Sequence, residues 1–199
     1  MREYLQKYNI EHLYHMTEIG NLPSIIKYGI CSHNEAIRKQ LMKTDISDEN
    51  VQDIRARIVD PFFNRCLHDY VPLYFSPRNP MLFRRQKQQD NIVILGIEPT
   101  ILGETNVLFT DGNAASQTTY FYLGFKQLNQ LPWRQIKAKY WTNYEDGKRI
   151  KCAEVLVYPR VRIDQINSIF CYSKKHWKTL TSLTQESLIK LQVKPILYF

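Results

Sequence analysis

The sequence predicts an α+β fold, on the basis of how its candidate strands and helices are distributed. Candidate strands outnumber candidate helices, and the helices gather in the first half of the chain and near its end. No internal repeat or low-complexity tract divides the sequence, and 199 residues is the usual length of about one domain. We therefore expect residues 1–199 to form one α+β domain.

The first elements are a short strand and a capped helix. Residues 13–17 have strand composition, and residues 21–30 read as a two-turn helix. Asn21 suits the N-cap, Pro23 is tolerated in the first turn, and Gly29 can supply the left-handed terminator. Apolar residues at helical spacing predict two further helices, over residues 36–42 and 48–58.

The middle of the chain is organised by prolines. Three prolines within residues 72–80 exclude a helix and a central strand throughout, so a short strand at 73–76 should open into a rigid loop. Beyond it we expect strands at residues 91–97, 107–110 and 163–172, a helix at 173–183, and a terminal strand at 195–199.

One strand carries an acidic residue among apolar neighbours. Residues 151–158 are rich in β-branched and aromatic side chains, and their alternation puts Glu154 on the same face as Cys152, Leu156 and Tyr158. Such a carboxylate is costly unless it stays wet, is paired, or acts on a ligand. Two interpretations are open: a glutamate on the solvent side of an edge strand, or a functional carboxylate.

The charge balance makes a polyanionic partner plausible. Lys and Arg number 27 against 19 Asp and Glu, which gives a net charge of +8. Cations and rings are interleaved in residues 133–151, where they predict either a strip that grips single-stranded nucleic acid or an amphipathic helix with snorkelling lysines. The candidate nucleic-acid-binding residues are Arg78, Arg84, Arg85, Arg134, Lys137, Lys139, Tyr140 and Trp141.

The cysteines and the hydrophobic runs indicate a cytoplasmic protein. Four cysteines lie far apart without a CxxC pair, which favours reduced thiols over a zinc site, and we expect no metal. The first residues are charged, and no apolar run approaches the roughly 18 residues of a membrane span. We therefore expect neither secretion nor a membrane partner.

Several segments, in this order, resemble the DarT family of nucleic-acid ADP-ribosyltransferases, which are bacterial toxins that use NAD. The proline-rich segment is the most specific of them, and together they span nearly the whole chain. The matching pieces are His15-Met16-Thr17 with residues 21–25, Arg57 with Pro61, residues 68–82, residues 109–114, and residues 153–157.

The resemblance implies the ADP-ribosyltransferase fold: two small, packed, mostly antiparallel sheets with flanking helices and a cleft for NAD. Glu154 matches the family's catalytic glutamate and Arg57 its essential arginine, although Arg55 lies close enough to compete for that role. The residues implied for the NAD site are His15, Met16, Thr17, Asn21, Ser24, Gly29, Arg57 and Tyr74.

The implied reaction explains the need for a carboxylate. Breaking the bond between ribose and nicotinamide develops positive charge on the sugar, which a carboxylate on the 2′-hydroxyl stabilises. The resemblance further implies sequence-selective modification of thymine in single-stranded DNA, and a toxin that is opposed by an antitoxin hydrolase. RNA or guanine as the target, or an inactive basic domain that only binds nucleic acid, are the alternatives.

Overall fold

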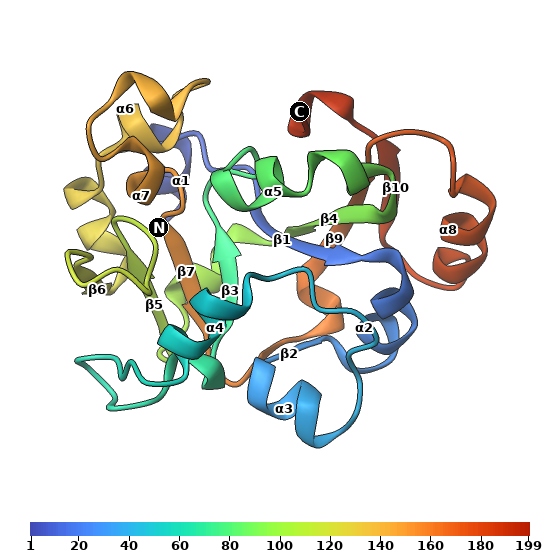
Figure 1. Cartoon of the computed structure of the whole chain (residues 1–199), viewed down its shortest axis with the longest axis horizontal. Coiled ribbons are helices and arrows are strands. Elements are labelled where there is room, and N and C mark those ends of the chain that lie inside the picture. Colours follow the sequence, from blue (N-terminus) through green and yellow to red (C-terminus); the bar gives the residue numbers. More distant parts are fainter.

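A computed structural model describes residues 1–199, and its strands form one large and one small sheet (Figure 1). The large sheet has eight strands in the order β10-β9-β4-β1-β3-β7-β5-β6, and the small sheet pairs β2 with β8. Only β9 and β10 run parallel. The strands are β1 (Leu13–Glu18), β2 (Ile30–Cys31), β3 (Val71–Tyr74), β4 (Ile92–Ile97), β5 (Val107–Thr110), β6 (Phe121–Leu123), β7 (Glu154–Val157), β8 (Arg160–Val161), β9 (Ile166–Cys171) and β10 (Lys190–Val193).

Short helices surround the large sheet. Helix α8 lies beyond the β10 end of the sheet, whereas α6 and α7 lie near the β5 and β6 end (Figure 1). The helices are α1 (Arg2–Lys7), α2 (Leu22–Tyr28), α3 (His33–Arg38), α4 (Glu49–Arg55), α5 (Pro80–Arg84), α6 (Trp133–Ile136), α7 (Gly147–Ile150) and α8 (Trp177–Thr184). The predicted α+β class is therefore confirmed.

The large sheet is nearly divided in two between β1 and β3. Strand β1 pairs with β4 along its whole length, but it pairs with β3 only through Tyr14 and Tyr74. Two four-stranded halves thus meet at a single residue pair. Where the resemblance implied two small sheets, the structure has two halves that this one pair joins.

Strand β7 lies inside the sheet, between β3 and β5. Its residues are all buried: Val155 and Val157 belong to the main hydrophobic cluster, and Leu156 belongs to a smaller cluster on the other face. The carboxylate-bearing residue Glu154 is 1% exposed. The interpretation of Glu154 as a solvated glutamate on an edge strand is therefore wrong.

The terminal strand predicted at residues 195–199 is also wrong. A 3-10 helix, Pro195–Leu197, occupies this position, and the strand that closes this edge of the sheet is β10, which precedes it. Pro195 cannot donate a backbone hydrogen bond to a neighbouring strand, which explains why the strand stops before it.

Gly29 is required where α2 turns into β2. Its φ is +77°, and a Cβ added there would lie 2.2 Å from the carbonyl oxygen of Val161 on β8. We expect Gly29→Ala to lower the free energy of unfolding by more than about 2 kcal/mol, because the left-handed backbone and the close contact both oppose a side chain. Urea denaturation measures this loss.

Gly124 provides the matched control for that prediction. It also has a positive φ, +86°, but no atom lies within 4 Å of the position its Cβ would take. Gly124→Ala should therefore show the conformational cost alone. Equal losses for the two variants would contradict the importance of the contact with β8.

Candidate active site

The carboxylate of Glu154 is held by two groups from other parts of the chain. Its Oε1 accepts a hydrogen bond from the backbone N–H of Ala114 at 3.0 Å. The guanidinium of Arg55 donates from one nitrogen, Nη1, to both carboxylate oxygens, at 2.9 and 3.2 Å. The backbone N–H of Glu154 donates to Thr110 Oγ1 at 3.1 Å, which ties β7 to the end of β5. The carboxylate is therefore fixed in place.

Arg55 is a buried arginine with hydrogen-bonding capacity to spare. It is the last residue of α4, a helix whose N-cap, Asp48, accepts hydrogen bonds from the first-turn N–H groups. Burial lowers the pKa of Arg55, but the charge of Glu154 and its hydrogen bond outweigh this, so that the pKa is raised. The second terminal nitrogen, Nη2, is buried and has no partner. A ligand beside the ion pair would find an unused donor there.

Arg57, the arginine that the resemblance implied, does not contact Glu154. It is exposed beyond the end of α4. Residues two positions apart on a helical turn point in nearly opposite directions, so when Arg55 faces the carboxylate, Arg57 faces solvent. The geometry thus favours the competing residue, Arg55.

A turn between β5 and β6 presents the Ala114 N–H to Glu154. Arg149, from α7, forms an ion pair with Asp111 at 2.8 Å and also donates to Thr119. The backbone N–H of Asn113 in turn donates to the carbonyl of Arg149 at 3.0 Å. Residues 109–114 were predicted as a strand and turn, but nothing in the sequence pattern indicated that Arg149 would fix the turn.

Lys151 is a second residue that the sequence did not single out. It is buried, and its Nζ donates to the carbonyls of Ile136 and Ala138 at 2.8 and 2.6 Å. Burial, with a further contribution from the charge of Arg78, lowers the pKa of Lys151 to about 8. Lys151 thereby anchors the segment that precedes β7.

A cavity of about 80 Å³ opens beside β1 and α2. Five of the residues implied for the NAD site line it, namely His15, Thr17, Asn21, Ser24 and Gly29. Met16 points to the opposite face of β1, where its side chain is buried in a cluster with Leu82 and Ile94. The structure thus brings five of the eight implied NAD residues together, and Met16, Arg57 and Tyr74 do not line this cavity.

His15 is held in one tautomer. Its Nδ1 lies 3.0 Å from the carbonyl of Pro72, which can only accept, so Nδ1 carries the proton. Burial lowers the pKa of His15 from 6.5, although the hydrogen bond to Pro72 opposes this. In the neutral ring, Nε2 is left with a lone pair that can accept a hydrogen bond from a ligand hydroxyl.

Asn21 lines this cavity and holds its neighbouring segments together by hydrogen bonds. Its side-chain amide donates to Thr17 and to the carbonyl of Thr44, and its oxygen accepts from the backbone N–H groups of Lys43 and Thr44. These hydrogen bonds hold residues 43–44 against β1 and leave the Asn21 side chain few free groups for a ligand. Asn21 shapes the cavity through this segment.

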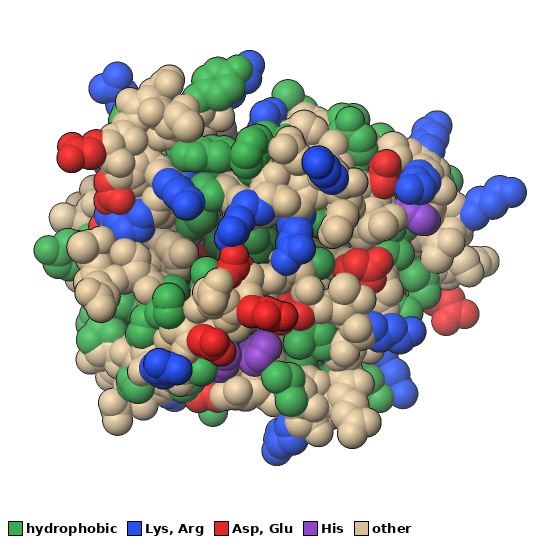
Figure 2. Space-filling view, viewed as in Figure 1, with side chains coloured by type: hydrophobic (Ala, Val, Ile, Leu, Met, Phe, Trp, Pro, Cys, Tyr) green, Lys and Arg blue, Asp and Glu red, His purple; other side chains and the backbone are tan.

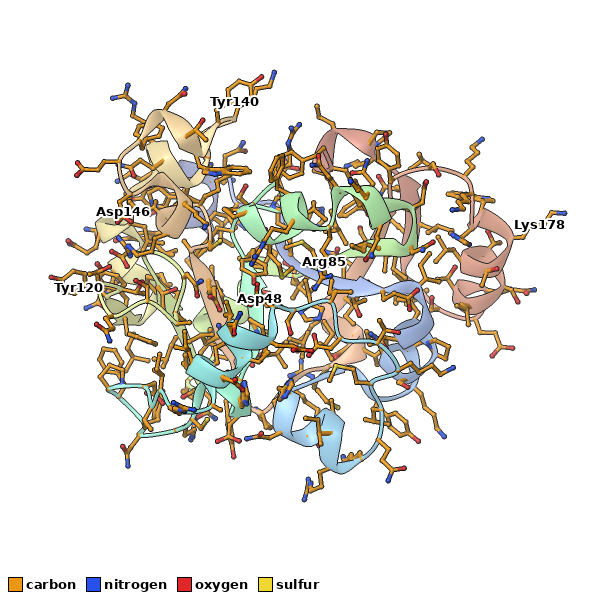
Figure 3. All side chains as sticks on the ribbon, in the orientation of Figure 1. Asp48, Arg85, Tyr120, Tyr140, Asp146 and Lys178 are labelled. Carbon is orange, nitrogen blue, oxygen red and sulfur yellow. The ribbon has the colours of Figure 1, made fainter.

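A second cavity, of about 210 Å³, lies between α5 and the segment that leads to α4. Arg84 pairs with Asp48 across it, and Arg85 donates to the carbonyls of Ile46 and Ser47 at 2.9 and 2.8 Å. Figure 3 shows Asp48 and Arg85 near each other at the centre of this face. Residues 41–48 border both cavities, since Leu41 and Met42 line the first, and Ile46 and Asp48 the second.

Tyr74 connects the second cavity to the buried ion pair. It lies opposite Glu154 in the β3–β7 register, and its hydroxyl lies 3.8 Å from the sulfur of Met81, which lines that cavity. Burial, followed by the charge of Glu154, raises the pKa of Tyr74 well above its usual value. Tyr74 therefore stays neutral beside the carboxylate.

The candidate nucleic-acid-binding residues fall into two groups. Arg78, Arg84, Arg85 and Trp141 lie on or against α5, where Figure 2 shows basic and hydrophobic side chains together. The other group lies on or just after α6, where Lys137 donates to the carbonyl of Tyr8, and Tyr140 projects outward at the edge of the molecule (Figure 3). This second group comprises Arg134, Lys137, Lys139 and Tyr140, all exposed.

Comparison with known proteins identifies the family. Residues 14–199 match the family described as "ssDNA thymidine ADP-ribosyltransferase, DarT". The chain belongs to the DarT family. This membership confirms the resemblance and the predicted class of DNA ADP-ribosyltransferase. A solved member of similar fold, Thermus sp. 2.9 DarT, is in complex with NAD+ (TM-score 0.82, 26% identity).

Two relatives illustrate the match in sequence. The chain is 32% identical over 175 residues to the DNA ADP-ribosyl transferase of Thermus sp. (strain 2.9), with 82% of each chain covered. It is 35% identical over 163 residues to a DNA ADP-ribosyl transferase-DNA ADP-ribosyl glycohydrolase fusion protein of Thermosipho africanus. That alignment covers 79% of this chain and 42% of the fusion protein, so the chain spans less than half the length of that relative.

Solved DarT structures have the same fold. Thermus sp. 2.9 DarT in complex with ADP-ribosylated ssDNA superposes with a TM-score of 0.85 at 27% identity, covering 96% of this chain and 97% of that one. Thermosipho africanus DarTG in complex with ADP-ribose superposes with a TM-score of 0.86 at 29% identity, covering 95% and 51%. In the present structure, no helix is both long and apolar enough to cross a membrane. No group of three or more His, Cys, Asp or Glu side chains is placed to hold a metal ion.

Proposed function

We propose that this DarT-family chain transfers ADP-ribose from NAD to thymidine in single-stranded DNA, with Glu154 and Arg55 as the reacting pair. The observation that carries the assignment is the buried contact between them, at 2.9 Å, on β7, two strands from the β1 residues that line a cavity with other residues implied for NAD. A buried charged pair with an unused donor is a functional-site arrangement.

Glu154 acts on the ribose that carries nicotinamide. When the bond from C1′ to nicotinamide breaks, positive charge develops on the sugar, and a carboxylate that holds the 2′-hydroxyl stabilises it. The Ala114 N–H and Arg55 keep the carboxylate oriented for this task. Nicotinamide departs without a protein acid, and the remaining requirement is a base nitrogen of the DNA aligned with C1′.

Arg55 takes the role that the resemblance gave to Arg57. A guanidinium resists deprotonation, so its natural contribution is electrostatic: it clamps the diphosphate of NAD or stabilises the thymine as that base loses its proton. Arg55 donates to both carboxylate oxygens of Glu154, and we infer that NAD binding shifts some of these Arg55 hydrogen bonds to the ligand. The unpartnered Nη2 supports this inference.

The cavity beside β1, about 80 Å³ in volume, receives one part of NAD. His15 accepts a ribose hydroxyl through Nε2, while Thr17, Ser24 and Gly29 border the ligand. Because the pKa of His15 lies below 6.5, the neutral ring persists as the pH falls through 6.5. We therefore expect the fall in NAD affinity on acidification, measured by calorimetry as Nε2 gains a proton, to have its midpoint below pH 6.5.

His15→Gln is the control for this pH dependence. The amide still offers an acceptor but does not titrate, so its weaker NAD binding should not change across the same pH range. A loss of wild-type affinity with its midpoint above pH 6.5 would contradict the assignment of His15.

The substrate is single-stranded, because a base inside a duplex cannot reach a buried carboxylate. The basic and aromatic residues around α5 are placed to receive the strand, since they adjoin the second cavity. Radiolabelled NAD and matched oligonucleotides of single-stranded DNA, duplex DNA and RNA test the proposal. Label should appear on single-stranded DNA containing thymidine; label on RNA alone or on guanine would overturn the choice of substrate, and no label on any of them would favour the inactive binding domain.

We further propose that the chain acts as the toxin of a toxin–antitoxin pair, opposed by a hydrolase that removes the modification. Support comes from the Thermosipho relative, in which the transferase is fused to a DNA ADP-ribosyl glycohydrolase. The proposed place of action is the cytoplasm, where such a DNA substrate is found. Co-expression with a DNA ADP-ribosyl glycohydrolase should relieve growth arrest caused by this chain.

A further inference from the structure

Three aromatic side chains from distant parts of the sequence meet at α5, the helix whose Met81 and Arg84 line the second cavity. They are Phe83 on α5, Trp141 at the start of the 3-10 helix Trp141–Asn143, and Phe199, and we call them the aromatic triad. The Phe83 ring centroid lies 5.6 Å from that of Trp141 and 5.2 Å from that of Phe199, and the last two lie 5.7 Å apart. Every pair is edge-to-face, an arrangement in which the edge of one ring meets the face of its neighbour.

The aromatic triad is partly exposed, and its Phe199 is held by neighbouring side chains. Phe83 is 43% exposed, and neither Trp141 nor Phe199 is buried. The side chain of Gln89 binds the backbone N–H and carbonyl of Phe199 at 3.2 and 2.8 Å. The guanidinium of Arg78 lies 4.6 Å from the Phe199 ring centroid. Exposed rings fixed in this way form a preorganised surface, which loses little entropy when a ligand binds.

Helix α5 links the triad to the second cavity and, through Met81 and Tyr74, to Glu154. Met81 and Phe83 are on the same short helix; Met81 lines the second cavity and contacts Tyr74, the register partner of Glu154. Two positions along a helix turn the side chain to nearly the opposite side, so Phe83 lies across α5 from Met81, while Arg84, which follows Phe83, lines the cavity. Arg84 follows Phe83 on α5, and its side chain is 66% exposed. The positive charge of Arg84 suits a nucleic-acid phosphate.

We propose that the aromatic triad stacks an unpaired base next to the target thymidine and so selects the strand that enters the second cavity. The inference rests on the proposed function, and it adds Phe83 and Phe199 to the substrate-binding residues. Rings stack on the faces of unpaired bases whatever their sequence, while Arg84 meets the phosphate that joins the stacked base to the target. Arg84 would then exchange Asp48 for that phosphate.

Equilibrium binding of a fluorescent single-stranded oligonucleotide to the full chain tests the proposal. By fluorescence anisotropy without NAD, Trp141→Leu should weaken binding about 5- to 100-fold, as expected when one base loses its stacking partner. Phe83→Leu should weaken it in the same direction, and because this ring is largely exposed, the variant keeps the fold. Phe62→Leu is the matched control: Phe62 is 46% exposed, in the loop between α4 and β3, and its loss should leave binding unchanged.

Removing bases from the oligonucleotide separates stacking from general weakening. With an abasic site at the position that stacks, the oligonucleotide should bind the wild type and Phe83→Leu equally, whereas abasic sites elsewhere should preserve the difference. A difference that survives at every abasic position, or unchanged binding in both triad variants, would overturn the proposal. Binding of an apolar peptide to the triad, with no effect of the variants on DNA, would assign the surface to a protein partner and overturn it as well.

Failure of the inference is distinguishable from failure of the proposed function. If the wild type labels single-stranded DNA with ADP-ribose, but the triad variants bind the oligonucleotide as tightly as the wild type does, the function stands and the stacking site is wrong. If the wild type transfers no ADP-ribose, yet its oligonucleotide binding depends on the triad and on the presence of a base at one position of the strand, the stacking site stands and the proposed reaction is wrong.

Discussion

Replacing Glu154 with glutamine is expected to reduce ADP-ribose transfer by about 100- to 1,000-fold or more, because the variant loses the negative charge that stabilises the oxocarbenium-like transition state. Glutamine is nearly isosteric and its oxygen can still accept the Ala114 N–H. The loss should therefore fall on kcat, with little change in KM for NAD. Steady-state kinetics with labelled NAD and a thymidine-containing oligonucleotide measure both values.

Folding has to be followed in the same experiment. Glu154→Gln leaves Arg55 buried opposite a neutral amide, and breaking a buried pair costs about 3–5 kcal/mol. Glu154→Asp retains the charge one methylene further from the sugar, and is expected to be folded and still strongly impaired. Glu104→Gln, which neutralises an exposed carboxylate paired with Arg162, is the matched control and should keep full activity. Near-normal transfer by folded Glu154→Gln would show that another carboxylate is responsible.

The second large effect is expected to separate two arginines of the same segment. Arg55→Ala should lower transfer by about 100-fold or more, since it removes the electrostatic partner of both the carboxylate and the ligand. It should also destabilise the fold by about 3–5 kcal/mol, because Glu154 remains buried without its partner. Arg57→Ala changes an exposed side chain, and we expect transfer within about twofold of the wild type and stability within about 0.5 kcal/mol.

Arg55→Lys refines this comparison. Lysine keeps the charge but lacks the planar guanidinium, whose remaining nitrogen is free to reach a ligand. A stable protein that is still inactive would assign the role to the geometry of the guanidinium as well as to its charge. If Arg57→Ala were the inactive variant and Arg55→Ala the active one, the assignment of the pair would be reversed.

The sequence predicted the parts of the site that depend on local pattern. The alternation of residues 151–158 placed Glu154 among apolar neighbours, and residue preferences located Asn21 and Gly29 at the two ends of one short helix, although the Asn21 side chain makes no capping hydrogen bond there. Strand alternation also set His15 and Thr17 on one face of β1, and both line the same cavity. Such features depend on the spacing of residues along the chain, which is visible in the sequence, and they can therefore be predicted.

What the sequence did not predict depends on contacts between distant segments. Arg55 and Glu154 are 99 positions apart, and only the exit angle of α4 decides whether Arg55 or Arg57 faces β7. The Arg149 clamp on the 111–119 turn and the aromatic triad likewise join segments far apart in the sequence. The short strands β2, β6 and β8 were missed because two or three residues carry too little periodicity to indicate a strand.

The single-pair joint between β1 and β3 was also beyond sequence reasoning. Nothing in the composition of either strand indicates that only Tyr14 and Tyr74 pair. The remaining residues of β1 diverge from β3, and the His15 cavity opens beside them. This division of the sheet is a property of strand twist and packing, which no window of residues encodes.

The central claim is that Glu154, held by Arg55, directs ADP-ribose onto a thymine base. Mass spectrometry of a single-stranded oligonucleotide with one thymidine, digested to nucleosides after incubation with NAD and the chain, tests it most directly. We predict ADP-ribosylated thymidine with the wild type and none with folded Glu154→Gln. Modification of another base by the wild type, or of thymidine by that variant, would contradict the account.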